Sequence, residues 1–208
     1  MFIYFRRNID GLHSWKPELI RGTGKDDSMA WEFVVLDFIQ ENIRNGILDT
    51  IMPMITSLGN GGIVWILLAV CLLISRKYRR TGVVLLAAIL IETVLCNGIL
   101  KPLIARPRPF DANPGIELLI APPGDASFPS GHTALAFAAV FALALSRERY
   151  WYLAAVLAVL IAFSRMYLYV DYPTDILAGI AVGAGSGMAA YAVLGKRRKQ
   201  SDVIRTEK

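Results

Sequence analysis

Three short stretches of the sequence, residues 101–109, 127–132 and 164–175, combine cationic, hydroxyl and imidazole side chains. Arginine offers two parallel N–H donors to a pair of phosphate oxygens, and lysine adds a compact positive charge. Serine and glycine at the start of a helix leave backbone N–H groups free to bind an anion. Together these residue types predict a site for a phosphate group.

Five residues are the candidate phosphate ligands. Lys101, Arg108 and Arg165 are the cations, while Ser130 and Gly131 precede an apolar run. Gly131 has no β-carbon, so the backbone can approach a bound group closely. Each residue alone has a plainer interpretation, because cations often anchor helix ends at a membrane surface and serine suits an N-cap. The occurrence of all three stretches on one predicted face favours the phosphate site.

Further residues could carry out proton transfer or nucleophilic chemistry beside these ligands. His132 follows Gly131 directly, and an imidazole can protonate a leaving oxygen near neutral pH. Asp171 and Asp175 are one helical turn apart, where two carboxylates repel each other and the pKa of one is raised. We expect Asp175 to orient a neighbouring group by hydrogen bonding. Glu92 lies inside an apolar segment and is either functional or a protonated structural residue.

Five apolar segments are predicted to be membrane-spanning helices that position these residues, 63–75, 82–104, 132–146, 151–164 and 175–194. A bilayer core about 30 Å thick needs about 20 helical residues, so the shorter segments must use flanking residues or locally thinned lipid. The composition agrees, because 55% of the chain is hydrophobic. The predicted fold is an all-α polytopic membrane helix bundle.

The region before the first span, residues 33–55, is predicted to be an amphipathic helix in the membrane interface. Apolar residues recur there at helical spacing and charged residues take the opposite face. We expect residues 1–28 to form a polar N-terminal extension on the outer side, with a re-entrant or sixth spanning segment as the alternative. Residues 29–195 form one membrane domain, and residues 196–208 form a basic cytoplasmic tail.

Basic clusters predict the orientation of the bundle. Residues 76–80, 147–149 and 196–199 fall on one side of it, and such an excess of lysine and arginine marks the cytoplasmic side. The phosphate site then lies on the extracytoplasmic face of the plasma membrane, with the C-terminus in the cytoplasm. The net charge of +5 is spread over these topology signals, so no nucleic-acid partner is expected.

The remaining signals are structural. Cys71 and Cys96 lie in separate apolar segments and are expected to be small fillers, not a disulfide. No zinc-ligand spacing occurs in the sequence, and neither a metal nor another cofactor is expected. The spacing of Gly179, Gly183 and Gly187 permits close helix contact, either within the chain or between two copies in a homodimer.

The order and spacing of the three stretches resemble the signature motifs of the PAP2 (type 2 phosphatidic acid phosphatase) superfamily. The matching residues are Lys101 and Arg108-Pro109, then Pro129-Ser130-Gly131-His132, then Ser164-Arg165 and Asp175. The resemblance covers roughly residues 29–194, and the layout is most similar to the small bacterial undecaprenyl-diphosphate phosphatases.

The resemblance implies a metal-independent lipid phosphatase that forms a covalent phospho-enzyme. It implies that His132 is the general acid, and that the phosphate is held by Lys101, Arg108, Arg165 and the amides of Ser130 and Gly131. Undecaprenyl diphosphate is the leading substrate, followed by phosphatidylglycerol phosphate, phosphatidic acid and other lipid phosphates. Lipid-to-lipid phosphotransfer and non-catalytic binding of a lipid phosphate are the alternatives.

One position departs from the family pattern, because Asp171 stands where the third motif has its histidine nucleophile. Asp171 could attack phosphorus itself, since aspartyl phosphates are established intermediates. It could instead be an inactivating change, natural or engineered, or another group or an activated water could attack slowly. A carboxylate reaches less far than an imidazole nitrogen, which favours an impaired or trapped enzyme.

Overall fold

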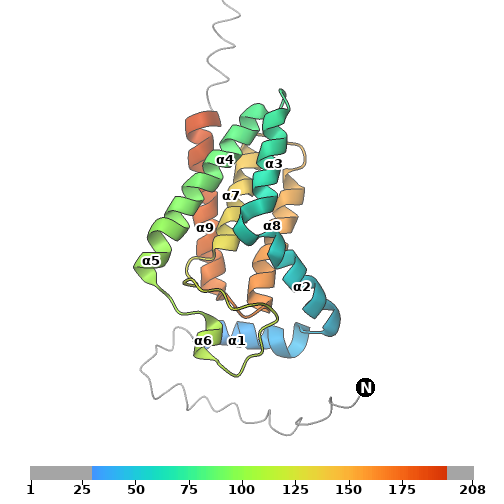
Figure 1. The fold of residues 1–208 in the computed structure, drawn as a ribbon, viewed down its shortest axis with the longest axis vertical. Helices are drawn as coiled ribbons and strands as arrows, with labels where there is room; N and C mark the ends of the chain where they lie inside the picture. The colour runs from blue at the N-terminus through green and yellow to red at the C-terminus, as the bar shows by residue number, and fades with distance from the viewer. Residues whose placement is uncertain (1–29, 196–208) are drawn as a thin grey trace, which may run out of the picture. The chain divides into compact units, whose positions relative to one another are not determined.

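A computed structural model of the chain describes residues 30–195, and all regular structure in that range is helical. Five longer helices run alongside one another (Figure 1): α3 (Ile63–Ile74), α4 (Arg79–Thr93), α7 (Gly131–Leu145), α8 (Trp151–Tyr167) and α9 (Pro173–Ala190). The predicted polar extension, 1–28, and basic tail, 196–208, lie outside the described residues.

Apolar side chains remain on the outer faces of these helices, as at Leu67, Leu90 and Val156. Within the described range, the helical segments Arg79–Ala112 and Pro173–Gly195 are long and apolar enough to cross a membrane. The pair Gly46–Leu58 and Asn60–Ile74, bent by 46°, also qualifies if it is taken as one span, whereas α7 and α8 are apolar but shorter. The prediction of an all-α membrane protein is confirmed, and the number of spans stays a prediction.

The predicted amphipathic helix over residues 33–55 is divided into two helices. α1 (Ala30–Phe38) continues into a π-helix (Ile39–Ile43), after which the chain is extended at Arg44. The side chain of Asn45 then accepts hydrogen bonds from two backbone amides of the first turn of α2 (Gly46–Leu58). A single helix over this region was therefore wrong, because an N-cap in its middle starts a second helix.

The glycine face of α9 packs directly against the backbone of α7. A β-carbon on Gly183 would lie 2.2 Å from the carbonyl oxygen of Ala134, and one on Gly187 would lie 2.9 Å from that of Ala138. Close packing of the small residues thus occurs inside the chain. Because α7 covers this face of α9, the glycine spacing is explained without a second copy of the chain. Whether the protein forms a homodimer stays a prediction.

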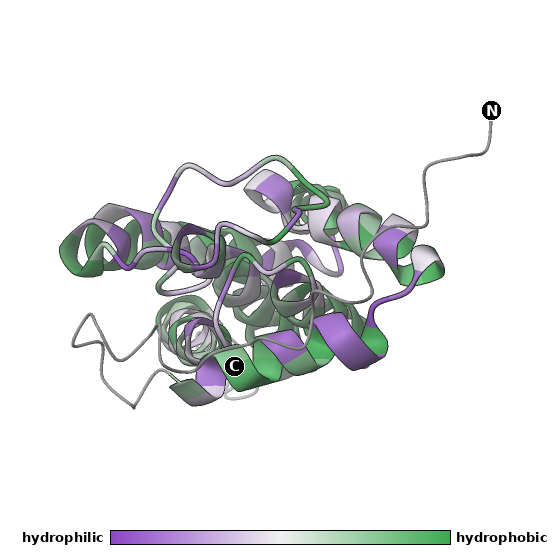
Figure 2. Ribbon diagram, turned by 90° about the horizontal axis from the view of Figure 1, so that it is seen from below, coloured by the Kyte–Doolittle hydropathy of each residue, from purple (hydrophilic) through white to green (hydrophobic). Residues whose placement is uncertain are grey.

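The helix ends that carry the three motif stretches meet at one end of the bundle. α8 ends there, α7 and α9 begin there, and α4 reaches it through a π-helix (Val94–Leu100) and α5 (Lys101–Ile104) (Figure 1). Viewed from this end, hydrophilic and hydrophobic segments are mixed along the ribbon (Figure 2). The amide of Ser130 donates to the carbonyl oxygen of Asp175 at 3.1 Å, which joins the start of α7 to the start of α9.

Candidate active site

Arg108 bridges two carboxylates at this end of the bundle. It lies between α5 and the short helix α6 (Pro109–Ala112), with its side chain turned into the protein. Its Nη1 donates to Oδ1 of Asp171 at 2.6 Å, and its Nη2 donates to Oδ1 of Asp125, also at 2.6 Å. Charge-assisted pairs of this length are the strong ones in proteins, so the guanidinium is firmly held.

Asp171 is buried in the short connection between α8 and α9. Besides its bond to Arg108, it accepts hydrogen bonds through Oδ2 from Nε of Arg165 at 3.0 Å and from Oγ of Ser130 at 2.7 Å. Burial alone would raise the pKa of Asp171, but Arg165 and Arg108 outweigh burial and hold that pKa below its usual range. An ionised carboxylate therefore lies among three of the residues predicted to bind phosphate.

Arg165 is fixed from its other side by α2. Its Nη1 donates to Oγ1 of Thr56 at 3.1 Å, and both side chains are buried. Sequence analysis missed Thr56, which directly follows the segment interpreted as an interfacial helix and is far from the motifs along the chain. The residue has no special type or spacing that could have identified it.

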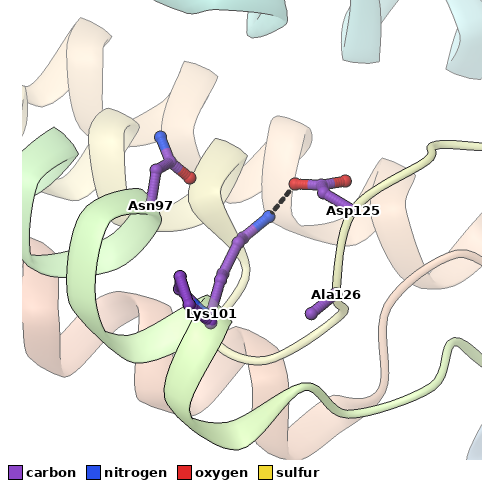
Figure 3. Close-up of a pocket in the computed structure, with 5 residues that line it drawn as sticks. Asn97, Lys101, Asp125 and Ala126 are labelled. Carbon is purple, nitrogen blue, oxygen red and sulfur yellow. Dashed lines mark hydrogen bonds and ion pairs between the residues drawn. The ribbon is translucent and has the colours of Figure 1, made fainter.

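Lys101 lies beside the start of α7, since a β-carbon on Gly131 would be 3.8 Å from its Nζ. Its ammonium group forms an ion pair with Asp125 (Figure 3). Next to this pair is a pocket of ≈ 420 Å³, which is also lined by Asn97 and Ala126. The predicted neighbours Lys101 and Gly131 are thus brought together with an acidic residue that was not predicted.

His132 occupies the first turn of α7 and is oriented by the connection between α2 and α3. Its Nε2 lies 2.9 Å from Oδ1 of Asn60. Gly59 makes room for the imidazole, because a β-carbon there would lie only 2.7 Å from the ring atom Cδ2 of His132. Neither Asn60 nor Gly59 was identified from the sequence.

Asp175 uses both carboxylate oxygens at the start of α9. Oδ1 accepts from Nη1 of Arg106 at 2.6 Å, and Oδ2 accepts from the amide of Tyr172 at 2.8 Å. Arg106 is also ion-paired with Glu32 of α1. Asp175 therefore fixes the beginning of its helix and Arg106, and its expected role in orienting residue 171 stays a prediction.

Glu92 is fully buried in α4 and makes no hydrogen bond to the site residues described above. Its Oε2 accepts from Oγ1 of Thr93 at 3.4 Å, and its Oε1 has no hydrogen-bond partner in the described part of the chain. This environment leaves both interpretations of Glu92, functional and structural, as predictions.

Six of the eight predicted site residues form one cluster in the structure. Its members are Lys101, Arg108, Ser130, Gly131, Arg165 and Asp171. His132 follows in the same helix turn as Gly131, and Asp175 is joined to Ser130 through its backbone. The apolar helices thus end in a shared polar site with three cations, an arrangement that suits an oxyanion ligand.

The PAP2 superfamily model matches residues 81–199, more than half of the chain. The chain therefore belongs to the PAP2 superfamily, and the family places it among the PAP2-type phosphatases. The match agrees with the motif resemblance and with the all-helical membrane fold.

Several named relatives are similar to the chain. It is 34% identical over 122 residues to an undecaprenyl-diphosphatase of Sulfolobus acidocaldarius. The alignment covers 58% of this chain and only 59% of the relative. It is 37% identical over 170 residues to the putative undecaprenyl-diphosphatase YbjG of Escherichia coli, covering 80% of this chain and 76% of the relative. A lipid A 4'-phosphatase of Bacteroides thetaiotaomicron is 32% identical over 174 residues, covering 76% and 77%.

Two solved structures share the fold. The crystal structure of LpxE from Aquifex aeolicus matches with a TM-score of 0.66 at 30% identity, over 76% of this chain and 94% of that one. A transmembrane PAP2-type phosphatidylglycerolphosphate phosphatase from Bacillus subtilis matches with a TM-score of 0.59 at 24% identity, over 79% and 92%. The second similarity concerns the fold alone.

Proposed function

We propose that this chain is an integral membrane phosphatase that removes a phosphate group from a lipid phosphate or diphosphate, with undecaprenyl diphosphate as the favoured substrate. The observation that carries the proposal is the convergence of Arg108, Arg165 and Ser130 on one small oxyanion, the carboxylate of Asp171. Carboxylate oxygens accept the same hydrogen bonds as phosphoryl oxygens. Donors arranged in this way therefore suit a phosphate group.

A lipid substrate fits the position of the site. The cations lie where apolar helices end, so a phosphate headgroup can reach them while its hydrocarbon tail stays beside the bundle. The relatives named undecaprenyl-diphosphatase and lipid A 4'-phosphatase support a lipid phosphate over a soluble ester.

In the proposed reaction a nucleophile attacks phosphorus, and the bond from phosphorus to the leaving oxygen breaks. His132 donates a proton to that oxygen, and water then releases inorganic phosphate from the covalent intermediate and returns the proton. Lys101, Arg108 and Arg165 offset the charge on the phosphoryl oxygens, while the Ser130 and Gly131 amides add donors at the start of α7.

Asp171 occupies the nucleophile position, and its contacts favour an impaired enzyme over a working aspartyl nucleophile. Both of its oxygens accept hydrogen bonds, and its pKa is held low by Arg165 and Arg108. The carboxylate is therefore a weak nucleophile, since nucleophilicity falls as the pKa falls. An incoming phosphate would also meet a like charge among its own ligands. The same contacts support a second candidate function, a non-catalytic binder of lipid phosphates.

We further propose five spans in the plasma membrane. The bent pair α2–α3, the α4–α5 segment, α7, α8 and α9 would each cross once, with the site extracytoplasmic and the C-terminus cytoplasmic. Arg79 and Arg147 lie at the bundle end opposite the site, which agrees with a cytoplasmic location of that end.

Phosphate release by the purified chain in mixed micelles tests the proposed reaction. The parent should release phosphate slowly from undecaprenyl diphosphate, faster than its His132→Ala variant and faster than it hydrolyses a water-soluble phosphate ester. If neither the parent nor Asp171→His releases phosphate from any lipid phosphate while both bind vanadate, the phosphatase proposal is rejected. The protein is then a non-catalytic binder of lipid phosphates.

A further inference from the structure

Asp125 is a second carboxylate at the cationic site, and it belongs to none of the three motif stretches. It lies on the loop between α6 and α7, with its side chain 54% exposed. Its Oδ1 accepts from Nη2 of Arg108 at 2.6 Å, and its Oδ2 is paired with the ammonium group of Lys101 (Figure 3). One acidic side chain is thus ion-paired with two of the three cations in the site.

Lys101 and Arg108 are two of the three cations proposed to bind the phosphate of the substrate. Partial burial would raise the pKa of Asp125, but Lys101 and Arg108 outweigh burial and hold that pKa below its usual range. The carboxylate is therefore ionised at neutral pH. A phosphate group and the Asp125 side chain compete for the same donors.

Asp125 can leave the site without moving a helix, whereas Asp171 is buried in a tight connection. A β-carbon on the preceding residue, Gly124, would meet no atom within 4 Å in the described part of the chain. The loop is anchored two residues later, where the amide of Ser127 donates to the carbonyl oxygen of Arg106 at 3.0 Å. The side chain can turn into solvent while Ser127 keeps the loop in place.

We propose that Asp125 is an internal competitor for the phosphate site, which every anionic headgroup must displace from Lys101 and Arg108. The proposal rests on the proposed function, since it takes these cations to be phosphate ligands. An internal competitor lowers the affinity of all ligands by the same factor, the fraction of molecules in which the site is open. Asp125 therefore leaves the ratio of ligand affinities unchanged, but it sets a threshold of affinity for occupancy of the site.

A threshold of this kind suits a site at a membrane surface. Phospholipid phosphodiesters carry one negative charge and are abundant there, whereas a terminal phosphate carries about 1.5 to 2 charges at neutral pH. Without Asp125, weakly held diesters would fill the site by concentration alone. With Asp125 in place they leave the site open to the more highly charged phosphates.

A competitor that is displaced lowers the affinity of every ligand by the same factor. This equality distinguishes it from a negative charge that merely lies near the site. A nearby charge would repel a dianion more than a monoanion, in proportion to ligand charge. Methyl phosphate, a dianion at pH 8, and dimethyl phosphate, a monoanion, are therefore suitable probes. Their affinities for the purified full chain can be measured by isothermal titration calorimetry.

Asp125→Asn should bind both probes about tenfold tighter than the parent, by the same factor, and Asp125→Ala should repeat this result. Glu117→Gln is the matched control, because Glu117 is an exposed acid on the same loop, and it should bind like the parent. In a Lys101→Met background the gain from Asp125→Asn should shrink, since the two residues share one contact.

The competitor is refuted if Asp125→Asn and Asp125→Ala fail to tighten binding, if methyl phosphate gains more than dimethyl phosphate, or if Glu117→Gln gains equally. If Asp125→Asn binds both probes more tightly but no variant releases phosphate from lipids, the proposed hydrolysis is rejected and the proposal for Asp125 is retained. Absence of binding in every variant would overturn both proposals.

Discussion

The guanidinium of Arg108 and the carboxylate of Asp171 form a buried ion pair, with 2.6 Å between Nη1 and Oδ1, at the position proposed for the nucleophile. The two residues are 3% and 2% exposed, so water compensates neither charge. Removing one partner of such a pair leaves an unpaired buried charge, whereas removing both charges does not. The consequences can be measured in both activity and stability.

Asp171→His should raise phosphate release from undecaprenyl diphosphate by about a thousandfold, equivalent to roughly 4 kcal/mol of transition-state stabilisation. An imidazole reaches further than a carboxylate and removes a negative charge from among the phosphate ligands. The measurement is initial-rate phosphate release by the purified variants. Adding His132→Ala to Asp171→His should abolish the gain, and an unchanged rate in Asp171→His would contradict an impaired nucleophile position.

Arg165→Ala should lower stability by about 1.5–3 kcal/mol, because the carboxylate of Asp171 loses one of its two buried charged partners. The double variant Arg165→Ala, Asp171→Asn should recover part of that loss, since residue 171 then carries no charge that needs the missing guanidinium. Thermal unfolding in detergent compares the two. Vanadate binding should be lost in both variants, which separates the stability effect from the ligand effect.

The stabilising effect of the Asp171 charge should be independent of pH from about pH 5 to 8 and disappear in acid. Arg165 and Arg108 hold the folded-state pKa of Asp171 below the ordinary value of 3.8, so this contribution is present above that value and lost as the pH falls through the folded pKa. The difference in melting temperature between the parent and Asp171→Asn should accordingly shrink only below about pH 4. A difference that shrinks near pH 6 would contradict the lowered pKa.

Gly183→Ala should destabilise the protein by about 1–3 kcal/mol, because its β-carbon would lie 2.2 Å from the carbonyl oxygen of Ala134. Gly185→Ala is the control in the same helix. No described atom lies within 4 Å of a β-carbon there, so this change should stabilise the helix by about 0.5–1 kcal/mol. Equal melting temperatures for the two variants would show that α9 does not pack on α7 through Gly183.

Cysteine labelling in intact cells should establish the orientation. In a background without Cys71 and Cys96, a cysteine at Asn113, on the loop near the site, should react with a membrane-impermeant thiol reagent. A cysteine at Lys77, at the opposite end of the bundle, should react only after the cells are opened. The reverse pattern would place the phosphate site in the cytoplasm.

The membrane fold and most of the site could be predicted from the sequence, because their signals are local. Apolar runs identify the helices of a bilayer protein without tertiary information. Arg108, Ser130 and Arg165 stand at fixed places relative to helix ends, so the order of the helices alone brings them together. The structure accordingly places them around one carboxylate.

The rest depended on contacts that local patterns do not contain. Both halves of residues 33–55 share the same apolar period, so this pattern does not reveal the helix break before Asn45. The break follows from the side chain of Asn45, which caps α2. Asp125 has the charge opposite to that of a phosphate ligand, so a search for cations passes over it. Small residues show that α9 packs closely on a neighbour, but only the three-dimensional arrangement shows that this neighbour is α7.

The glycine contacts of α9 also limit which changes of chain length the protein can tolerate. Each residue advances a helix by about 100°, so a single insertion between Asp175 and Gly179 would turn Gly179, Gly183 and Gly187 away from α7 and bring larger side chains against it. The two helices would then separate, and the carbonyl oxygen of Asp175 would no longer meet the amide of Ser130. Insertions and deletions among homologues of this sequence should accordingly be concentrated in the loop between α6 and α7, where an added residue rotates no helix.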